Sequence, residues 1–183
     1  MIPITALCAK PGNPGYFHST GRALSLPLVL IMVSLREVID ALEMQFDDVS
    51  SYLDQETGEV CSVSHDTLSL AESGGSPDAL PGWQRQEFEV ARLILESDRF
   101  LKLPSGWDIH EWEIMQRFSF SLKRASVRDA LLSALQGAGA FRSFKAALRR
   151  FRLQEAWFEY RSQALRRIAI EWCQEHGIPY QEG

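Results

Sequence analysis

Apolar residues recur at intervals of three and four positions along most of the chain after Val33, which is the spacing of an amphipathic helix. The first such row follows Ser34, and Ser34 with Glu37 matches a capping box, in which each side chain bonds an unpaired amide of the first turn. The row consists of Leu35, Val38, Ile39, Leu42 and Phe46. The opposite face is acidic and carries Glu37, Asp40, Glu43 and Asp47. We therefore expect a helix that buries one face and exposes carboxylates on the other.

The pattern changes over residues 49–63, VSSYLDQETGEVCSV, where β-branched and aromatic residues form two short runs. Thr57 and Gly58 separate the runs, as expected for a type I turn with a glycine bulge, so the segment predicts a β-hairpin. Residues 71–82, AESGGSPDALPG, are small and turn-forming and are interpreted as an internal loop. After a helix expected from Trp83 to Ser97, the run RFLKLP at residues 99–104 predicts a third strand.

Helical spacing continues to the end of the chain. Asp108 and Glu111 match a second capping box, and the row behind it is Trp112, Met115, Phe118 and Leu122. Ser126 is the expected cap of a helix that ends at Gly137, with Val127, Leu131 and Leu135 turned inward. The last helix is expected from Leu153 to Glu175, with Trp157, Tyr160, Ala164, Ile168 and Trp172 in line. Gly177 and Ile178 then provide a stop signal.

These elements predict an α+β fold: a mostly helical single domain with a small antiparallel β-sheet, made of the hairpin and one further strand. The domain is expected to cover residues 32–183. Residues 1–31 contain four prolines and three glycines and show no helical or strand periodicity. They are interpreted either as a poorly ordered N-terminal extension or as a mis-assigned start, with Met32 as the true first residue.

Three segments in this order, YLDQETGEV (52–60), GAGAFRSFKAAL (137–148) and EWCQEHGI (171–178), resemble a bacterial family known as uncharacterised protein family 0158. The most specific match is GxGAFxxFK, carried here by Gly137, Gly139, Ala140, Phe141, Phe144 and Lys145. The resemblance covers about Val33 to Ile178. It implies a bacterial protein, but the family has no established activity, so it assigns no role to any residue.

Composition excludes several classes of protein. The net charge of −5 and the pI near 5.4 argue against a globally basic nucleic-acid binder. The three cysteines, Cys8, Cys61 and Cys173, are far apart and form no CxxC pair, which indicates neither a disulfide framework nor a zinc site and favours a reducing cytosol. The longest apolar run, Leu24 to Val33, is about half of the ~20 residues that span a bilayer, and no cleavage signal follows it. We expect a cytoplasmic protein without a membrane span.

No motif for catalysis, metal binding or cofactor binding is complete. Asp54, Glu56 and Glu59 lack the spacing of a calcium loop. HEWEI at residues 110–114 has Ile114 where a zinc protease motif needs its second histidine. His65 and Asp66 come without a nucleophile elbow, and the glycines at 137 and 139 lack the strand and the lysine of a phosphate loop. The sequence therefore predicts no catalytic residue, no metal and no cofactor.

Residues 137–151, GAGAFRSFKAALRRF, carry two parallel rows at helical spacing. The apolar row is Phe141, Phe144, Leu148 and Phe151, and the basic stripe is Arg142, Lys145, Arg149 and Arg152. Residues 141–167 contain eight basic and two acidic residues, whereas residues 34–59 contain eight acidic and one basic. The charge is therefore unequally distributed along the chain.

Three interpretations of the basic stripe remain open. In the first, the stripe is a solvated helix face, or it flanks the acidic helix after Ser34 and forms ion pairs with it within the same molecule. In the second, it is the contact surface of a non-enzymatic binding module for a protein or an RNA. In the third, it is the anchor of an enzyme for an anionic substrate, although no nucleophile or general base accompanies it.

Overall fold

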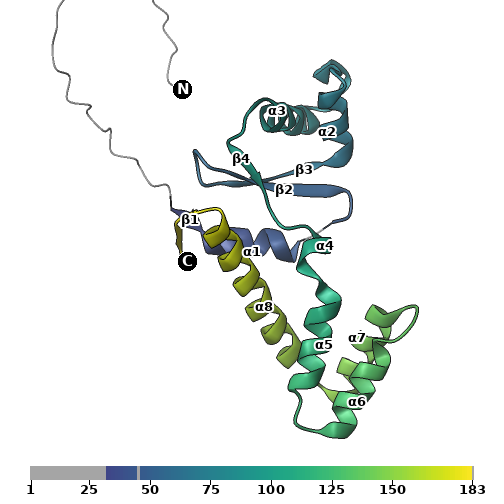
Figure 1. Cartoon of the computed structure of the whole chain (residues 1–183). Helices are drawn as coiled ribbons and strands as arrows, with labels where there is room; N and C mark the ends of the chain where they lie inside the picture. Colours follow the sequence, from purple (N-terminus) through teal and green to yellow (C-terminus); the bar gives the residue numbers. More distant parts are fainter. Residues whose placement is uncertain (1–31, 45, 183) are drawn as a thin grey trace, which may run out of the picture.

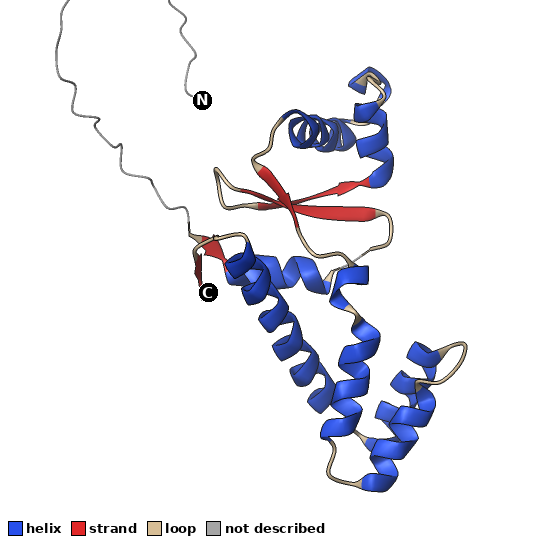
Figure 2. Cartoon of the chain, in the orientation of Figure 1, coloured by secondary structure: helices blue, strands red, loops and turns tan. Residues whose placement is uncertain are grey.

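The structure is a computed structural model that describes residues 32–44 and 46–182; the expected N-terminal extension, residues 1–31, lies outside the described residues. The expected α+β class is confirmed, with helices in the majority and a small antiparallel sheet (Figure 2). The elements follow in this order: β1 (Val33–Ser34), α1 (Leu35–Glu43), β2 (Val49–Asp54), β3 (Val60–Ser64), α2 (His65–Glu72), the 3-10 helix η1 (Pro77–Ala79), α3 (Gly82–Glu96), β4 (Phe100–Lys102), α4 (Gly106–Ile109), α5 (Glu111–Ser121), α6 (Ala125–Ala134), α7 (Ala140–Phe151), α8 (Gln154–Glu175) and β5 (Tyr180–Gln181).

The antiparallel sheet has the strand order β3-β2-β4 and lies between α2 and α3 on one face and α1 on the other (Figure 1). Leu53 pairs with Val60 on one side and with Leu101 on the other, and all three join the main hydrophobic core. Val63 is buried and shares the opposite face with its pairing partner Ser50, whose side chain contacts His65 at the start of α2. The sheet is therefore covered by helices on both faces.

The predicted hairpin and third strand are confirmed. Gly58 takes a left-handed φ of 77°, which a residue with a β-carbon adopts only at a cost, and its amide donates to the carbonyl of Asp54 at 2.8 Å. The amide of Asp54 donates to the carbonyl of Glu59 at 2.9 Å and closes the turn. The glycine at this position thus explains the register of β2 and β3.

The remaining helices extend away from the sheet (Figure 1). Helix α8 is the long one, and at 22 residues it measures about 33 Å. Its first turns meet α5 and α7 through edge-to-face contacts of Trp157 with Phe118 and Phe144, whose ring centroids lie 5.4 and 5.1 Å away. Its end is closed as predicted: Gly177 has a φ of 65°, and the amide of Ile178 donates to the carbonyl of Cys173 at 2.8 Å.

The short strands β1 and β5 hold the two ends of the described chain together. They pair in parallel, with Val33 opposite Tyr180, and the amide of Val33 donates to the carbonyl of Pro179 at 3.0 Å. Because β5 follows α8 and β1 precedes α1, this pair places the start of α1 beside the end of α8 (Figure 1). The sequence did not predict either strand.

The predicted caps are wrong in three places. Ser34 stands at the N-cap of α1, but its side chain accepts no capping hydrogen bond. The second capping box lies one turn earlier than expected, between Ser105 and Asp108, and opens α4. His110 then turns left-handed with a φ of 51°, so α5 begins at Glu111, and Ser126 lies inside α6, after the N-cap Arg124.

Helical periodicity also predicts the burial of some apolar residues wrongly. Helix α1 ends at Glu43, so Phe46 lies beyond it with 63% of its surface exposed. Trp112 and Phe141 are exposed as well, although the other members of their rows are buried or half-buried. Helix α2, which follows β3 directly, was not predicted; the Ser64 hydroxyl caps it by accepting from the amide of Thr67.

Candidate binding surface

The basic stripe lies on the exposed face of α7. Phe144 and Leu148 are buried and attach the helix to the core, while all members of the stripe are exposed, namely Arg142, Lys145, Arg149 and Arg152. The first three are on the helix proper, and Arg152 is its C-cap, with a left-handed φ of 56°. The helical spacing of the sequence therefore correctly predicts that the basic stripe points outward, although Phe141 of the apolar row is exposed as well.

The cations of the stripe have no partner among the described residues. None of the four forms a side-chain hydrogen bond or an ion pair with another residue in 32–44 or 46–182. Other arginines of the same basic segment are paired: Arg161 Nε lies 2.8 Å from Glu111 Oε1, and Arg166 pairs with Glu182. The stripe is therefore a row of exposed positive charges on one helix that no described acidic side chain compensates.

The stripe does not flank the acidic face of α1, and that expectation is wrong. Helix α7 ends next to the first turn of α8, whereas α1 lies beside the last turns of α8, where β1 pairs with β5 (Figure 1). The two charged helices are thus separated by much of the length of α8. An ion pair between them within one molecule is not possible in this arrangement.

A shallow hollow of about 330 Å³ lies at the end of α7, between it and the α5–α6 connection. Its lining includes Lys123 and Arg124, together with Phe151 and Leu153. The Arg150 guanidinium lies 5.3 Å from the centroid of the Phe151 ring, so it adds another cation beside the hollow. Sequence reasoning missed Lys123 and Arg124 because only the packing of α6 against α7 brings them to the same end as the stripe.

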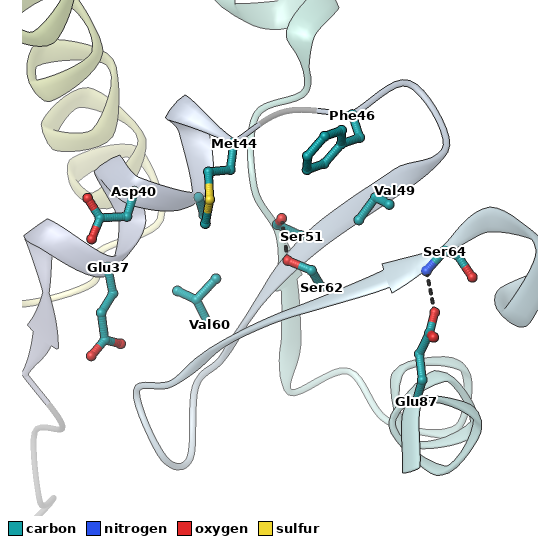
Figure 3. A pocket seen from close by; sticks show the side chains of 11 residues that line it. Glu37, Asp40, Met44, Phe46, Val49, Ser51, Val60, Ser62, Ser64 and Glu87 are labelled. Atoms are coloured by element: carbon teal, nitrogen blue, oxygen red, sulfur yellow. Dashed lines mark hydrogen bonds between the residues drawn. The ribbon is translucent and has the colours of Figure 1, made fainter. Parts of the chain in front are cut away.

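An acidic groove of about 560 Å³ lies far from the stripe, between α1 and the hairpin (Figure 3). Apolar side chains line it: Ala41, Met44, Phe46, Val49 and Val60. Its carboxylates are Glu37 and Asp40 on α1 and Glu87 on α3, and its hydroxyls are Ser51, Ser62 and Ser64. Met44 and Phe46 remain largely exposed there. The exposed Phe46 is therefore part of the wall of this groove.

Glu87 is held in place as a carboxylate. Its Oε1 accepts from the Ser64 amide at 2.7 Å (Figure 3). Burial acts to raise the pKa of Glu87, but the hydrogen bonds from Ser64 and Thr67 outweigh it and hold the pKa below its usual value. The far rim of the groove therefore stays negatively charged at neutral pH.

The carboxylates near residues 108–113 have structural partners. The Asp108 carboxylate accepts from the amide and the hydroxyl of Ser105, at 2.8 and 2.6 Å, and these hydrogen bonds lower its pKa. Glu113 pairs with Arg117 at 3.2 Å. Asp108, His110 and Glu113 do line a hollow of about 190 Å³ with Arg167. Over the described residues, however, no group of three His, Cys, Asp or Glu side chains is arranged to hold a metal ion.

The structure brings His65 to a serine that sequence reasoning did not single out. His65 Nε2 lies 3.0 Å from the Ser50 hydroxyl, while no described acidic side chain bonds the other ring nitrogen. Ser50 is buried, and neither residue lines the three hollows described above. The pair lacks both the orienting acid and the access that a nucleophile needs.

The acidic hairpin turn is paired with an arginine. Arg99 Nη2 lies 3.0 Å from Asp54 Oδ2, and Arg99 Nη1 lies near Glu56 Oε2 at 2.6 Å. The Asp54 carboxylate also accepts from the Glu56 amide at 2.9 Å. These contacts join the β2–β3 turn to the start of β4 and account for two of the three carboxylates that suggested a cation site.

Two further findings concern the cysteine thiols and the length of the apolar helices. Cys61 and Cys173 are free thiols, and burial raises the pKa of both, which makes them less reactive. Cys8 lies outside the described residues. Within residues 32–44 and 46–182, no helix has the length and apolar character needed to cross a bilayer.

Comparison with the curated proteins and with the solved structures found no match. The model of one protein family, described as uncharacterised protein family UPF0158, matches residues 26–181. The match spans every described element and begins upstream of Met32. Its extent agrees with the resemblance of the hairpin, of the α6–α7 segment and of the end of α8. The chain therefore belongs to the uncharacterised protein family UPF0158.

Proposed function

We propose that this chain is a non-enzymatic, cytoplasmic binding module that holds an acidic surface of a protein partner on its basic stripe. The observation that carries the proposal is the uncompensated charge of α7: Arg142, Lys145, Arg149 and Arg152 are exposed and have no ion partner among the described residues. A row of arginines beside an exposed aromatic side chain is typical of a protein interface. Phe141, 47% exposed and next to Arg142, provides that aromatic side chain. The free thiols of Cys61 and Cys173 fit a reducing cytosol.

An acidic protein fits these charges better than an RNA does. The molecule carries a net charge of −5, and its acidic helix α1 would repel a long polyanion that extended past the stripe. A protein partner contacts a limited area and avoids that repulsion. RNA, for which Phe151 and the nearby Lys123 and Arg124 would offer a stacking ring and cations, is the competing outcome of the experiment below.

The alternative function, an enzyme that acts on an anionic substrate, has less support. None of the stripe residues lines the three hollows described above, so none of these spaces would hold a substrate against the stripe. The hollow that contains Asp108 and Glu113 is small, and both carboxylates are engaged by neighbours. A binding role needs none of the missing catalytic groups.

The test is capture of partners from a lysate of the native cell by the full chain, with and without nuclease treatment. The wild type is compared with a variant in which Arg142, Lys145, Arg149 and Arg152 are changed to glutamate. A control variant carries the same change at four exposed cations elsewhere, Arg36, Arg92, Lys102 and Arg117. We expect one protein that survives nuclease treatment, is captured by the wild type and the control, and is lost by the stripe variant. Capture that disappears with nuclease would assign the stripe to RNA, and partners that all variants retain would contradict the proposal.

A further inference from the structure

We infer that a second copy of this chain is a partner of the basic stripe: the acidic groove of one molecule takes α7 of the next, so that the molecules associate head to tail. This inference rests on the proposed function, because it names the acidic surface that the stripe holds. The groove and the stripe carry opposite charges, and apolar side chains are exposed at both, namely Met44 and Phe46 in the groove and Phe141 beside the stripe.

The groove has the chemistry that would receive a basic amphipathic helix. Its lining combines the apolar side chains of Met44, Phe46 and Val60 with the carboxylates of Glu37 and Asp40. The contact of Asp40 with Arg36, at 3.9 Å between two exposed side chains, is a weak ion pair that leaves the carboxylate available. A helix that lies in an apolar groove with charges along the rim is a common mode of recognition.

Helix α7 carries the complementary face. Phe141 is half exposed at its first turn, and Arg142 and Lys145 follow it one turn apart. Glu37 and Asp40 on α1 are also one turn apart. Two helices packed side by side could therefore match acid to base turn for turn, while Phe141 covers Met44 and Phe46.

The groove and the stripe of the same molecule cannot contact each other, because α1 and α7 lie at opposite ends of α8 (Figure 1). Between molecules the contact is heterologous: each copy uses its groove for one neighbour and its stripe for another. Such contacts build rings when the rotation closes and open chains when it does not. We therefore expect association beyond a dimer as the concentration rises.

The experiment is sedimentation equilibrium of the full chain over a range of concentrations at low and high salt. The wild type should exceed its monomer mass of 20.7 kDa at about 0.1 M salt, where charges act over ~10 Å. At about 1 M salt this reach falls to ~3 Å, and the apparent dissociation constant should rise at least about tenfold. A wild type that stays monomeric at every concentration overturns the inference.

Two charge-reversed variants test which surfaces meet. The groove variant is Glu37→Lys/Asp40→Lys, and the stripe variant is again the one in which Arg142, Lys145, Arg149 and Arg152 are changed to glutamate. Each should be monomeric alone, because both of its surfaces then carry the same sign. Mixed together they should associate again, since the reversed groove of one now fits the reversed stripe of the other. The control Glu72→Lys/Asp98→Lys, at exposed acids that do not line the groove, should associate like the wild type.

Association that persists in either variant alone, or a mixture that stays monomeric, overturns the inference. The result is separable from the proposed function. If self-association does not depend on the stripe while the stripe variant still loses its captured protein, the second copy is excluded and the binding module stands. If neither association nor capture depends on the stripe, both fail.

Discussion

At the scale of single residues, the aromatic cluster at the start of α8 determines how the stripe is presented. Trp157 contacts Phe118 of α5 and Phe144 of α7 edge to face, and Phe118 also meets Tyr160 at 5.4 Å. Because Phe144 is buried in this cluster, the side chains about 100° away from it on α7 must point to solvent. The orientation of the basic stripe therefore follows from the packing of these rings.

Replacing Trp157 should remove this support. Trp157→Ala empties a site in which 4% of the side chain is exposed, so we expect the free energy of unfolding to fall by about 3 to 5 kcal/mol. The neighbouring residue Phe158, 64% exposed, provides the control, since Phe158→Ala should change it by less than about 0.5 kcal/mol. Urea unfolding of both variants measures the difference. Similar values for the two would show that Trp157 is not a core residue.

Residue periodicity predicts the interior of helices better than their ends. Trp157 and Trp172, expected to be inward, are both buried, and so are Phe144 and Leu148. Phe46 and Phe141 follow the same spacing yet are exposed, because α1 ends before the first and the second lies in the opening turn of α7. Spacing shows on which face of a helix a residue lies, but it does not show where that helix ends or how far a neighbouring helix covers it.

At the scale of elements, capping boxes were harder to predict than helices. Ser34, Ser105 and Asp108 each stand three residues before a carboxylate near the start of a helix, and of these three only Ser105 has both reciprocal bonds. The box needs an extended backbone at its first residue and a free amide three residues later. Asp108 cannot begin a box because it already ends one, and the left-handed His110 follows it.

Removing the Ser105 hydroxyl should destabilise the α4 turn in a pH-dependent way. Ser105→Ala should cost about 1 kcal/mol of unfolding free energy at neutral pH. The hydrogen bonds from Ser105 lower the pKa of Asp108 in the folded protein, so their contribution is fully present above the unfolded pKa of about 3.9 and is lost as the pH falls through the folded pKa. Urea unfolding of wild type and variant between neutral pH and about pH 2 measures this. A difference that does not shrink in acid would contradict the assignment.

At the scale of the whole molecule, the sequence correctly predicts an uneven charge distribution but not how its parts are placed. Arg161 and Arg166 count toward the basic segment in sequence, yet in space they pair with Glu111 and Glu182. Lys123 and Arg124, outside that segment, lie beside Phe151. Distance along the chain does not give distance in space, which is why the expected contact of α1 with the stripe fails.

The N-terminal segment gives a second prediction at this scale. We expect truncated proteins that begin at Leu26 and at Met32 to keep the thermal midpoint of the full chain, because the proline and glycine spacing of residues 1–31 offers no periodic apolar face. Comparison of the two truncated proteins tests residues 26–31, which the family model includes, separately from the residues before them. A midpoint several degrees lower for the Met32 start alone would show that residues 26–31 stabilise the fold.

The most direct test of a binding role for the basic stripe is partner retention by Lys145→Ser/Arg149→Ser, measured on protein whose unfolding free energy is also determined. Both side chains are exposed and unpaired among the described residues, so stability should change by less than about 0.5 kcal/mol. Retention of the captured protein should be lost, whereas the matched variant Lys102→Ser/Arg167→Ser, at two exposed cations that also form no ion pair among the described residues, should retain it. Loss of stability with undiminished retention would contradict the account and make the stripe a structural feature of the fold.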